Sequence, residues 1–375
     1  MRRILITKEI EHLAQIYAEG MMKGENLSNN PIDNLNKLKA QMESASTCFY
    51  FKRGKKSSTS GRIKKHYKSS EFPQYAEYIQ KIIDKYGIIN NLHPRDYDVL
   101  INEMEGILAK EDLTVSVKIG KGKWMPFANH IVKSMDYEGV REIVFRHYIR
   151  NEVVGIKSCV YCNAQFAITS VLEPAITPDD VKRMKGRGRR PNPRPAQLGA
   201  TYDLDHNKPK DKYPYLCTNF YNLQPCCSSC NRHKNDIEID FNVYYWDSEE
   251  PKPLYFELKP RDLIRFGVYN QCGKMTPILQ DKVGGKLVKQ FNDRFSVNAI
   301  YEEYADEVQE LLWHYRIYSK SNMDVLMNRL SGLFSDGFDI ECFIYGAYIE
   351  EKDAHKRPLT IMKQDIIEQL KREGL

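Results

Sequence analysis

Two pairs of closely spaced cysteines are the clearest chemical signal in this sequence. Cys159 and Cys162 are separated by two residues, and Cys227 and Cys230 repeat that spacing further along the chain. Four thiolates arranged in such pairs are typical of a tetrahedral zinc site. Because four thiolates leave the metal no open coordination position, the sequence predicts a structural zinc that joins the two ends of the intervening segment.

The other cysteines carry less information. Cys226 remains an alternative ligand, although Cys227 keeps the two-residue spacing, and Cys217 could also lie near the metal. The remaining three are expected to be ordinary core or surface residues: Cys48, Cys272 and Cys342. The chain has nine cysteines, an odd number, and no convincing signal peptide, which together favour metal binding over disulfides. The lack of a convincing signal peptide also favours a cytoplasmic location.

A second group of polar residues lies between and beside the cysteine pairs. His206 could take a proton from water near neutral pH, and oxygen atoms of Asp205 and Asn231 suit a hard cation such as Mg²⁺. Adjacent residues of a strand point to opposite faces, so Asp205 and His206 can act together only if the strand ends or twists there. Asp203 would share the face of Asp205 and is a backup ligand.

This block resembles the HNH endonucleases of the ββα-metal, or His-Me finger, group over residues 156–236. The resemblance is carried by the following pieces: Asp205-His206, Asn222-Leu223, and the Cys-x2-Cys-Asn-x2-Lys run of Cys227–Lys234. Two further pieces look closest to the subset named after the Septu nuclease PtuB: Pro209-Lys210 and Tyr213-Pro214. Those proteins are linked to anti-phage systems and to retrons, usually beside an ATPase.

The resemblance implies a role for each matching residue. His206 would be the general base, while Asp205 and Asn231 would hold a catalytic Mg²⁺ or Mn²⁺. Asn222 would orient His206 by bonding the backbone of the loop. The third motif position is Asn231 rather than histidine, and the nearby His233 is an alternative ligand.

Basic residues are concentrated in two segments, 52–68 and 182–194. Together they hold 15 Lys and Arg and no acid, which leaves a formal charge of −9 on the rest of a chain whose net charge is +6. Two local patches suggest two contacts with one polyanion, although a linker or a solvated surface would look the same. Glycines and prolines in 182–194 argue against regular structure and favour an arm that substrate orders. The residues expected to contact nucleic acid are Lys182, Arg183, Arg187, Arg189, Arg190, Lys210 and Lys234.

Apolar spacing divides the chain into three parts, and the predicted fold class is α+β. A small zinc-stapled ββα-metal HNH module, 151–245, is expected between mostly helical regions at 1–150 and 246–375. Helices are predicted at 8–22, 31–45, 75–86, 136–150, 300–318, 322–334 and 359–372. A strand is predicted at 113–119, short strands and loops at 251–297, and no membrane span.

The predicted function is a metal-dependent HNH endonuclease that hydrolyses phosphodiester bonds of nucleic acid, with DNA as the expected substrate. By resemblance it would be the effector of a bacterial anti-phage defence system that acts with an ATPase partner. Two alternatives stay open. One is a zinc-dependent nucleic-acid-binding protein that does not cut, and the other is a subunit that stays inactive until an ATPase partner senses infection.

Overall fold

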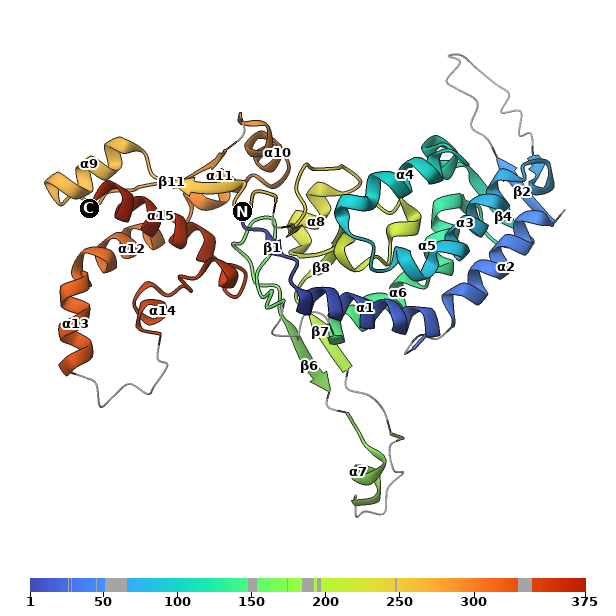
Figure 1. Cartoon of the computed structure of the whole chain (residues 1–375), viewed down its shortest axis with the longest axis horizontal. Coiled ribbons are helices and arrows are strands. Elements are labelled where there is room, and N and C mark those ends of the chain that lie inside the picture. The colour runs from blue at the N-terminus through green and yellow to red at the C-terminus, as the bar shows by residue number, and fades with distance from the viewer. Residues whose placement is uncertain are drawn as a thin grey trace.

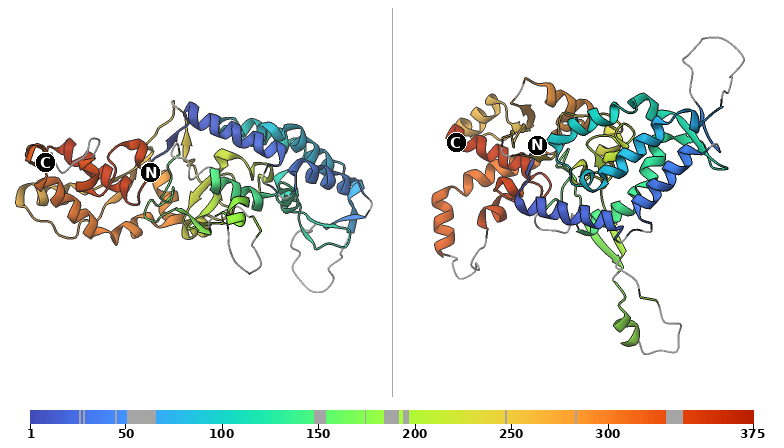
Figure 2. Two further views of the ribbon diagram at one scale, coloured as in Figure 1. Left: turned by 90° about the horizontal axis from the view of Figure 1, so that it is seen from below. Right: turned by 45° about the vertical axis from the view of Figure 1, so that its right-hand side comes forward.

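The structure, a computed structural model, is elongated, with the middle segment, 151–245, between two larger regions (Figures 1 and 2). It describes all residues except 26, 28, 45, 51–65, 148–153, 174, 184–191, 194–196, 247, 283 and 330–338. Most of the basic segment 52–68, and Arg187, Arg189 and Arg190 of the second segment, therefore lie outside the described residues. In the described part of the chain, no helix is long and apolar enough to cross a membrane.

The N-terminal region combines helices with one small antiparallel sheet. Its helices are α1 (Lys8–Lys23), α2 (Pro31–Glu43), α3 (Gln74–Ile89), α4 (Tyr97–Glu105), α5 (Phe127–Ser134) and α6 (Tyr137–His147). The sheet has the order β3-β2-β4-β5, formed by His66–Lys68, Thr47–Tyr50, Ser116–Ile119 and Met125–Pro126. The predicted strand at 113–119 is therefore only half correct, because Lys110–Thr114 forms a 3-10 helix.

Helix α3 shows how sequence spacing produces this region. Tyr75, Tyr78, Ile79 and Ile82 recur at helical steps and are all buried. The helix predicted at 75–86 should stop at Gly87, since glycine disfavours helix interiors, but the helix continues to Ile89, so this stop is wrong. A Cβ atom on Gly87 would lie 3.3 Å from the Met22 sulfur, so this glycine allows α1 and α3 to approach closely.

The C-terminal region is mainly helical, as expected. Its helices are α9 (Pro260–Tyr269), α10 (Lys286–Phe295), α11 (Val297–Glu302), α12 (Ala305–Ile317), α13 (Lys320–Arg329), α14 (Ile340–Tyr345) and α15 (Thr360–Glu373). Strands β11 (Leu254–Glu257) and β12 (Ile278–Asp281) pair in antiparallel fashion. The prediction of short strands and loops at 251–297 is only partly correct, because this stretch holds the helices α9 and α10 besides the strands β11 and β12. The single helix predicted at 300–318 is interrupted between α11 and α12. Helix α9 buries only Leu263 and Phe266, too few apolar positions for a clear periodic signal.

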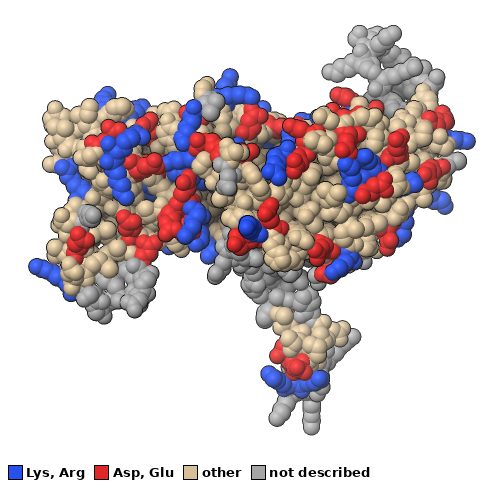
Figure 3. Space-filling model, viewed as in Figure 1, with Lys and Arg blue, Asp and Glu red and all other residues tan. Residues whose placement is uncertain are grey.

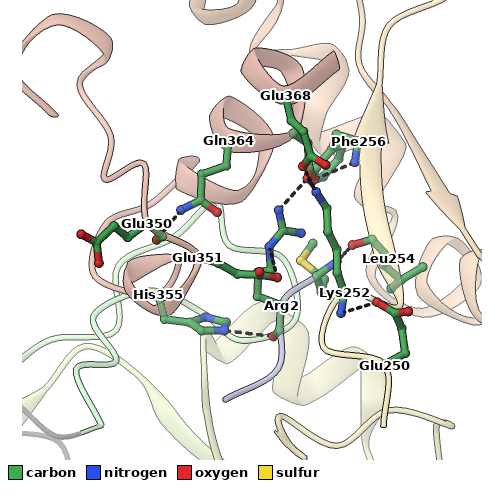
Figure 4. Close-up of polar contacts among 12 residues, drawn as sticks. Arg2, Glu250, Lys252, Leu254, Phe256, Glu350, Glu351, His355, Gln364 and Glu368 are labelled. Atoms are coloured by element: carbon green, nitrogen blue, oxygen red, sulfur yellow. Dashed lines mark hydrogen bonds and ion pairs between the residues drawn. The ribbon is translucent and has the colours of Figure 1, made fainter. Parts of the chain in front are cut away.

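The start of the chain is fastened to the C-terminal region by a buried polar network (Figure 4). The guanidinium of Arg2 donates to Asp365 at 2.6 Å, and the Lys252 ammonium lies 2.9 Å from the same carboxylate. The His355 ring donates through Nε2 to the carbonyl of Arg2 at 3.0 Å. The adjoining β1 (Ile4–Leu5) pairs in parallel with β10 (Tyr244–Tyr245), so the first residues connect the C-terminal region to the end of the middle segment.

The middle segment contains two hairpins and a short helix. One hairpin, β6 (Thr169–Glu173) with β7 (Gln197–Ala200), projects from the body and carries α7 (Pro178–Arg183) near its tip (Figure 1). The other pairs β8 (Asp203–His206) with β9 (Leu223–Cys226), and α8 (Ser228–Lys234) follows directly and packs on β8. The described residues thus run β, β, α across the stretch that carries the polar motifs.

Candidate metal centre and active site

The four paired cysteines converge into one buried cluster. Cys159, Cys162, Cys227 and Cys230 each offer a sulfur, and these sulfurs all lie within 4.8 Å of one another. Zinc–sulfur bonds of about 2.3 Å in a tetrahedron require sulfur separations of about 3.8 Å, so the cluster fits a metal ion of this kind. The predicted four-cysteine set is confirmed as a site that could hold a metal.

The two alternative cysteines lie outside the cluster. Cys217 is buried with its sulfur 3.8 Å from the Met135 sulfur, and burial raises its pKa to about 12. Cys226 occupies the last position of β9, opposite Asp203, and is buried separately. Neither thiol is therefore needed to complete a tetrahedral set.

Each cysteine pair also positions a residue that contacts Asp205. Tyr161, inside the first pair, donates its hydroxyl to an Asp205 oxygen at 2.5 Å. The second pair begins α8, where the Cys230 amide donates to the Cys227 sulfur at 3.5 Å. That helix places Lys234 with its ammonium 2.9 Å from the same Asp205 oxygen. A metal in the cluster would thus hold both supports of Asp205 in place.

A cavity of about 630 Å³ opens beside β8. Its walls come from four parts of the chain: α6, β8, the loop that follows β8, and α8. The lining residues are Tyr137, Arg141, Ala200, Tyr202, Asp203, Leu204, Asp205, His206, Pro209, Lys210, Asp211, Asn231, Arg232, Asn235 and Asp236. Strand β8 ends at His206, which allows Asp205 and His206 to line one cavity although neighbours in a strand face opposite ways. The structure therefore brings Asp205, His206 and Asn231 together.

The His206 ring is held in a defined tautomer. Its Nε2 lies 3.0 Å from the Cys217 carbonyl, which can only accept, so Nε2 carries the hydrogen in the neutral ring and Nδ1 keeps the lone pair. Nδ1 has no hydrogen-bond partner among the described residues. Burial, aided by the charges of Lys210 and Lys234, lowers the pKa of His206 to about 3, so the ring is neutral at pH 7. The Tyr137 ring packs against it at a centroid distance of 4.7 Å.

Lys234 does not have the position predicted for it. Its side chain is 0% exposed, and its ammonium donates to the His206 carbonyl at 2.7 Å besides pairing with Asp205. A buried ammonium requires such partners to offset its lost hydration. The expectation that Lys234 contacts a phosphate is therefore wrong, because the side chain is enclosed behind β8.

The oxygen atoms available for a divalent cation differ in their surroundings. Asp205 is 4% exposed and already accepts from Tyr161 and Lys234. Asp203 is half-buried, lines the cavity, and accepts from the Asn231 amide nitrogen at 3.1 Å. Asp203 and Asn231 thus offer the more accessible oxygen pair, and Asp205 lies two residues further along the same face of β8. His233, the alternative ligand, is exposed and does not line the cavity.

Asn222 bonds the backbone of the loop that follows β8. Its Oδ1 accepts from the Lys208 amide at 2.7 Å, and its Nδ2 donates to the carbonyls of Lys208 and Leu216. Leu216 immediately precedes Cys217, whose carbonyl holds the His206 ring. Asn222 is fully buried and therefore fixes the loop that orients His206.

Two residues that line the cavity carry no signal in the local sequence. Tyr137 and Arg141 come from α6, in the N-terminal region, and reach the cavity only through the tertiary fold. Arg232 could have been found as the residue after the Asn231 motif position. Tyr161 could have been suspected from its place between two metal-ligand cysteines.

Charge on the rest of the surface is mixed. On the face drawn in Figure 3, Lys and Arg alternate with Asp and Glu over the whole body. Of the second basic segment, Lys182 and Arg183 are exposed at the end of α7, and Lys182 lies 3.2 Å from Asp179. These two residues lie on the projecting β6–β7 arm, whose base at Ala200 borders the cavity.

Comparison with known proteins gives no relative on which to rest a function. No protein-family model, no curated protein and no solved structure matches this chain.

Proposed function

We propose that this protein is a metal-dependent endonuclease of the HNH kind that hydrolyses phosphodiester bonds of nucleic acid. The observation that carries the proposal is His206, a neutral ring with its Nδ1 lone pair unpaired among the described residues. It lies on the same cavity as Asp203, Asp205 and Asn231. A general base beside a set of oxygen ligands is the arrangement that phosphodiester hydrolysis requires.

His206 would take the proton from the attacking water. Burial is the main cause of its low pKa, which makes His206 a weak base in the free protein. A phosphate bound beside Lys210 would offset the smaller contribution that the positive charges make to this low pKa. The Cys217 carbonyl would stabilise the imidazolium that forms by accepting from Nε2. Asn222 keeps that carbonyl in place through its bond to Leu216.

A Mg²⁺ or Mn²⁺ bound at the cavity would stabilise the negative charge that develops on the phosphate. Asp205 and Asn231 are the proposed ligands, and the position of Asp203 makes it a third. The carboxylate of Asp205 must share its charge with Lys234, so Asp203 is expected to contribute strongly to metal affinity. Zinc in the four-cysteine cluster would have no catalytic step and would hold the two supports of Asp205.

Substrate and biological role rest on the resemblance to the PtuB-like nucleases. DNA is the proposed substrate, and the proposed role is that of an effector in bacterial anti-phage defence, in the cytoplasm. An ATPase partner would then control when the nuclease acts. A preparation that binds DNA but cuts only after such a partner is added would support this part of the proposal.

Plasmid nicking tests the proposed activity. Wild-type protein with Mg²⁺ or Mn²⁺ should convert supercoiled plasmid to open circles, and a chelator should stop it. His206→Ala should bind DNA with unchanged affinity and cut about 10²–10⁴ times more slowly, the usual contribution of a general base. If wild-type protein binds DNA but never cuts with either metal, alone or with such an ATPase partner, the alternative of a zinc-dependent binding protein is the correct one.

A further inference from the structure

The N-terminal region contributes directly to the cavity through helix α6. The Tyr137 hydroxyl donates to the Leu204 carbonyl at 3.2 Å, and its ring packs on His206, so the start of α6 is fixed against β8. Arg141 lies one helical turn later, on the same side of the helix as Tyr137, and lines the same cavity. The side chain of Arg141 is exposed.

Two further cations line this cavity from other elements. Lys210 lies in the loop after β8, and Arg232 lies on α8. Within the described residues, none of the three, Arg141 included, forms an ion pair with a carboxylate. The Lys210 ammonium lies instead over the Tyr137 ring, 5.6 Å from its centroid.

The lysines on either side of Lys210 behave differently. Lys208 and Lys212 both pair with Glu238, at 3.1 Å and 3.9 Å. Glu238 therefore neutralises Lys208 and Lys212, and Lys210, which faces the cavity, keeps a charge that is unpaired among the described residues. Unpaired cations around a hollow suit an anionic ligand, since no internal contact must be broken for it to bind.

We propose that Arg141, Lys210 and Arg232 form a phosphate clamp that holds the backbone of the nucleic-acid strand across the cavity, with Arg141 supplied by the N-terminal region. The proposal rests on the proposed function for the identity of the ligand, but it concerns binding rather than cleavage. Arginine can contact a phosphate through two parallel hydrogen bonds, so Arg141 and Arg232 would fix its orientation as well as attract it. Phosphate contacts carry no sequence information, so the clamp should bind all sequences alike.

Binding measured over a range of salt concentrations tests the clamp. A short DNA duplex and each of its single strands serve as probes, in buffer without divalent cations so that no cutting occurs. For Arg141→Ala, the slope of log K against log salt should shrink by about 0.9 on the duplex and about 0.7 on single strands. Arg265→Ala removes an exposed arginine of α9, outside the cavity, and should leave the slope unchanged.

The outcomes separate the clamp from the nuclease. If Arg141→Ala binds like Arg265→Ala while His206→Ala loses cleavage, the clamp is wrong and the nuclease stands. If Arg141→Ala loses one phosphate contact but wild-type protein never cuts, alone or with an ATPase partner, the clamp stands and the nuclease is wrong. Arg141→Lys should keep the salt slope and lose only part of the affinity, whereas a merely structural role for Arg141 would change thermal stability and leave the slope intact.

Discussion

Two buried histidines in different regions share one chemical state and differ in what surrounds them. His206 in the middle segment and His355 in the C-terminal region each donate through Nε2 to a backbone carbonyl at 3.0 Å. Burial lowers the pKa of His206 to about 3 and that of His355 to about 4. His206 lines a cavity of about 630 Å³, whereas Nδ1 of His355 is enclosed with no hydrogen-bond partner among the described residues.

The ion pairs beside these histidines repeat the comparison. Lys234 pairs with Asp205 next to His206, and Arg2 pairs with Asp365 next to His355, and both pairs are almost fully buried. A buried charge pair or a shifted pKa is thus no evidence of a functional site by itself. The network around His206 and Asp205 differs from the network around His355 and Asp365 because it adjoins a cavity with accessible oxygens and with cations that are unpaired in the described part of the chain.

The largest expected effect concerns the metal cluster, which supports the network around His206 through Tyr161 and Lys234. Cys227→Ser should abolish metal binding and prevent stable folding of the middle segment, because binding of a structural metal contributes its free energy to folding. Elemental analysis should find about one zinc per wild-type molecule and none in the variant. Cys342→Ser, a half-buried cysteine outside the cluster, should keep the zinc. Zinc-free wild-type protein that remains folded would contradict this prediction.

A smaller loss of stability is expected when the network around His355 and Asp365 is broken. Arg2→Met leaves the Asp365 carboxylate with Lys252 as its remaining cationic partner in a buried position. Loss of one member of a buried pair usually costs about 3–5 kcal/mol of unfolding free energy, and Lys252 should bring the cost to the lower end. Denaturant unfolding measures this loss. Cleavage per folded molecule should not change, and a fall in that rate would show that the two networks are coupled.

The smallest effect is a pH dependence of stability at His355. Its folded pKa of about 4 lies below the value near 6.5 of an unfolded histidine, so between these pH values only the unfolded chain binds the proton. The stabilisation is therefore complete above about pH 6.5 and is lost as the pH falls toward 4. Thermal melts at pH 7 and pH 5 should show a larger drop for wild type than for His355→Gln, which keeps a donor for the Arg2 carbonyl. Equal drops would mean that His355 does not lose a proton on folding.

The comparison also shows what the sequence could reveal. Cysteine spacing predicted the metal cluster because zinc imposes its own geometry on residues close in sequence. The motif positions of His206, Asn222 and Asn231 could likewise be predicted, since local loop and helix geometry places these side chains. The burial of Lys234 and the position of Arg141 at the cavity could not be predicted, because both depend on packing between elements far apart in the chain. Gly87 was read as a helix stop for the same reason, as its partner Met22 lies on another helix.

The cleavage rates of two matched histidine variants test the proposed role of His206 as the general base. His206→Ala and His355→Ala each remove a buried, neutral histidine that donates to a backbone carbonyl. Single-turnover plasmid cleavage with Mn²⁺ should be measured for both, with each rate divided by the folded fraction. We expect His206→Ala to cut about 10²–10⁴ times more slowly, while His355→Ala loses stability and keeps the wild-type rate per folded molecule. Equal rates for the two variants would contradict the assignment of His206 as the general base.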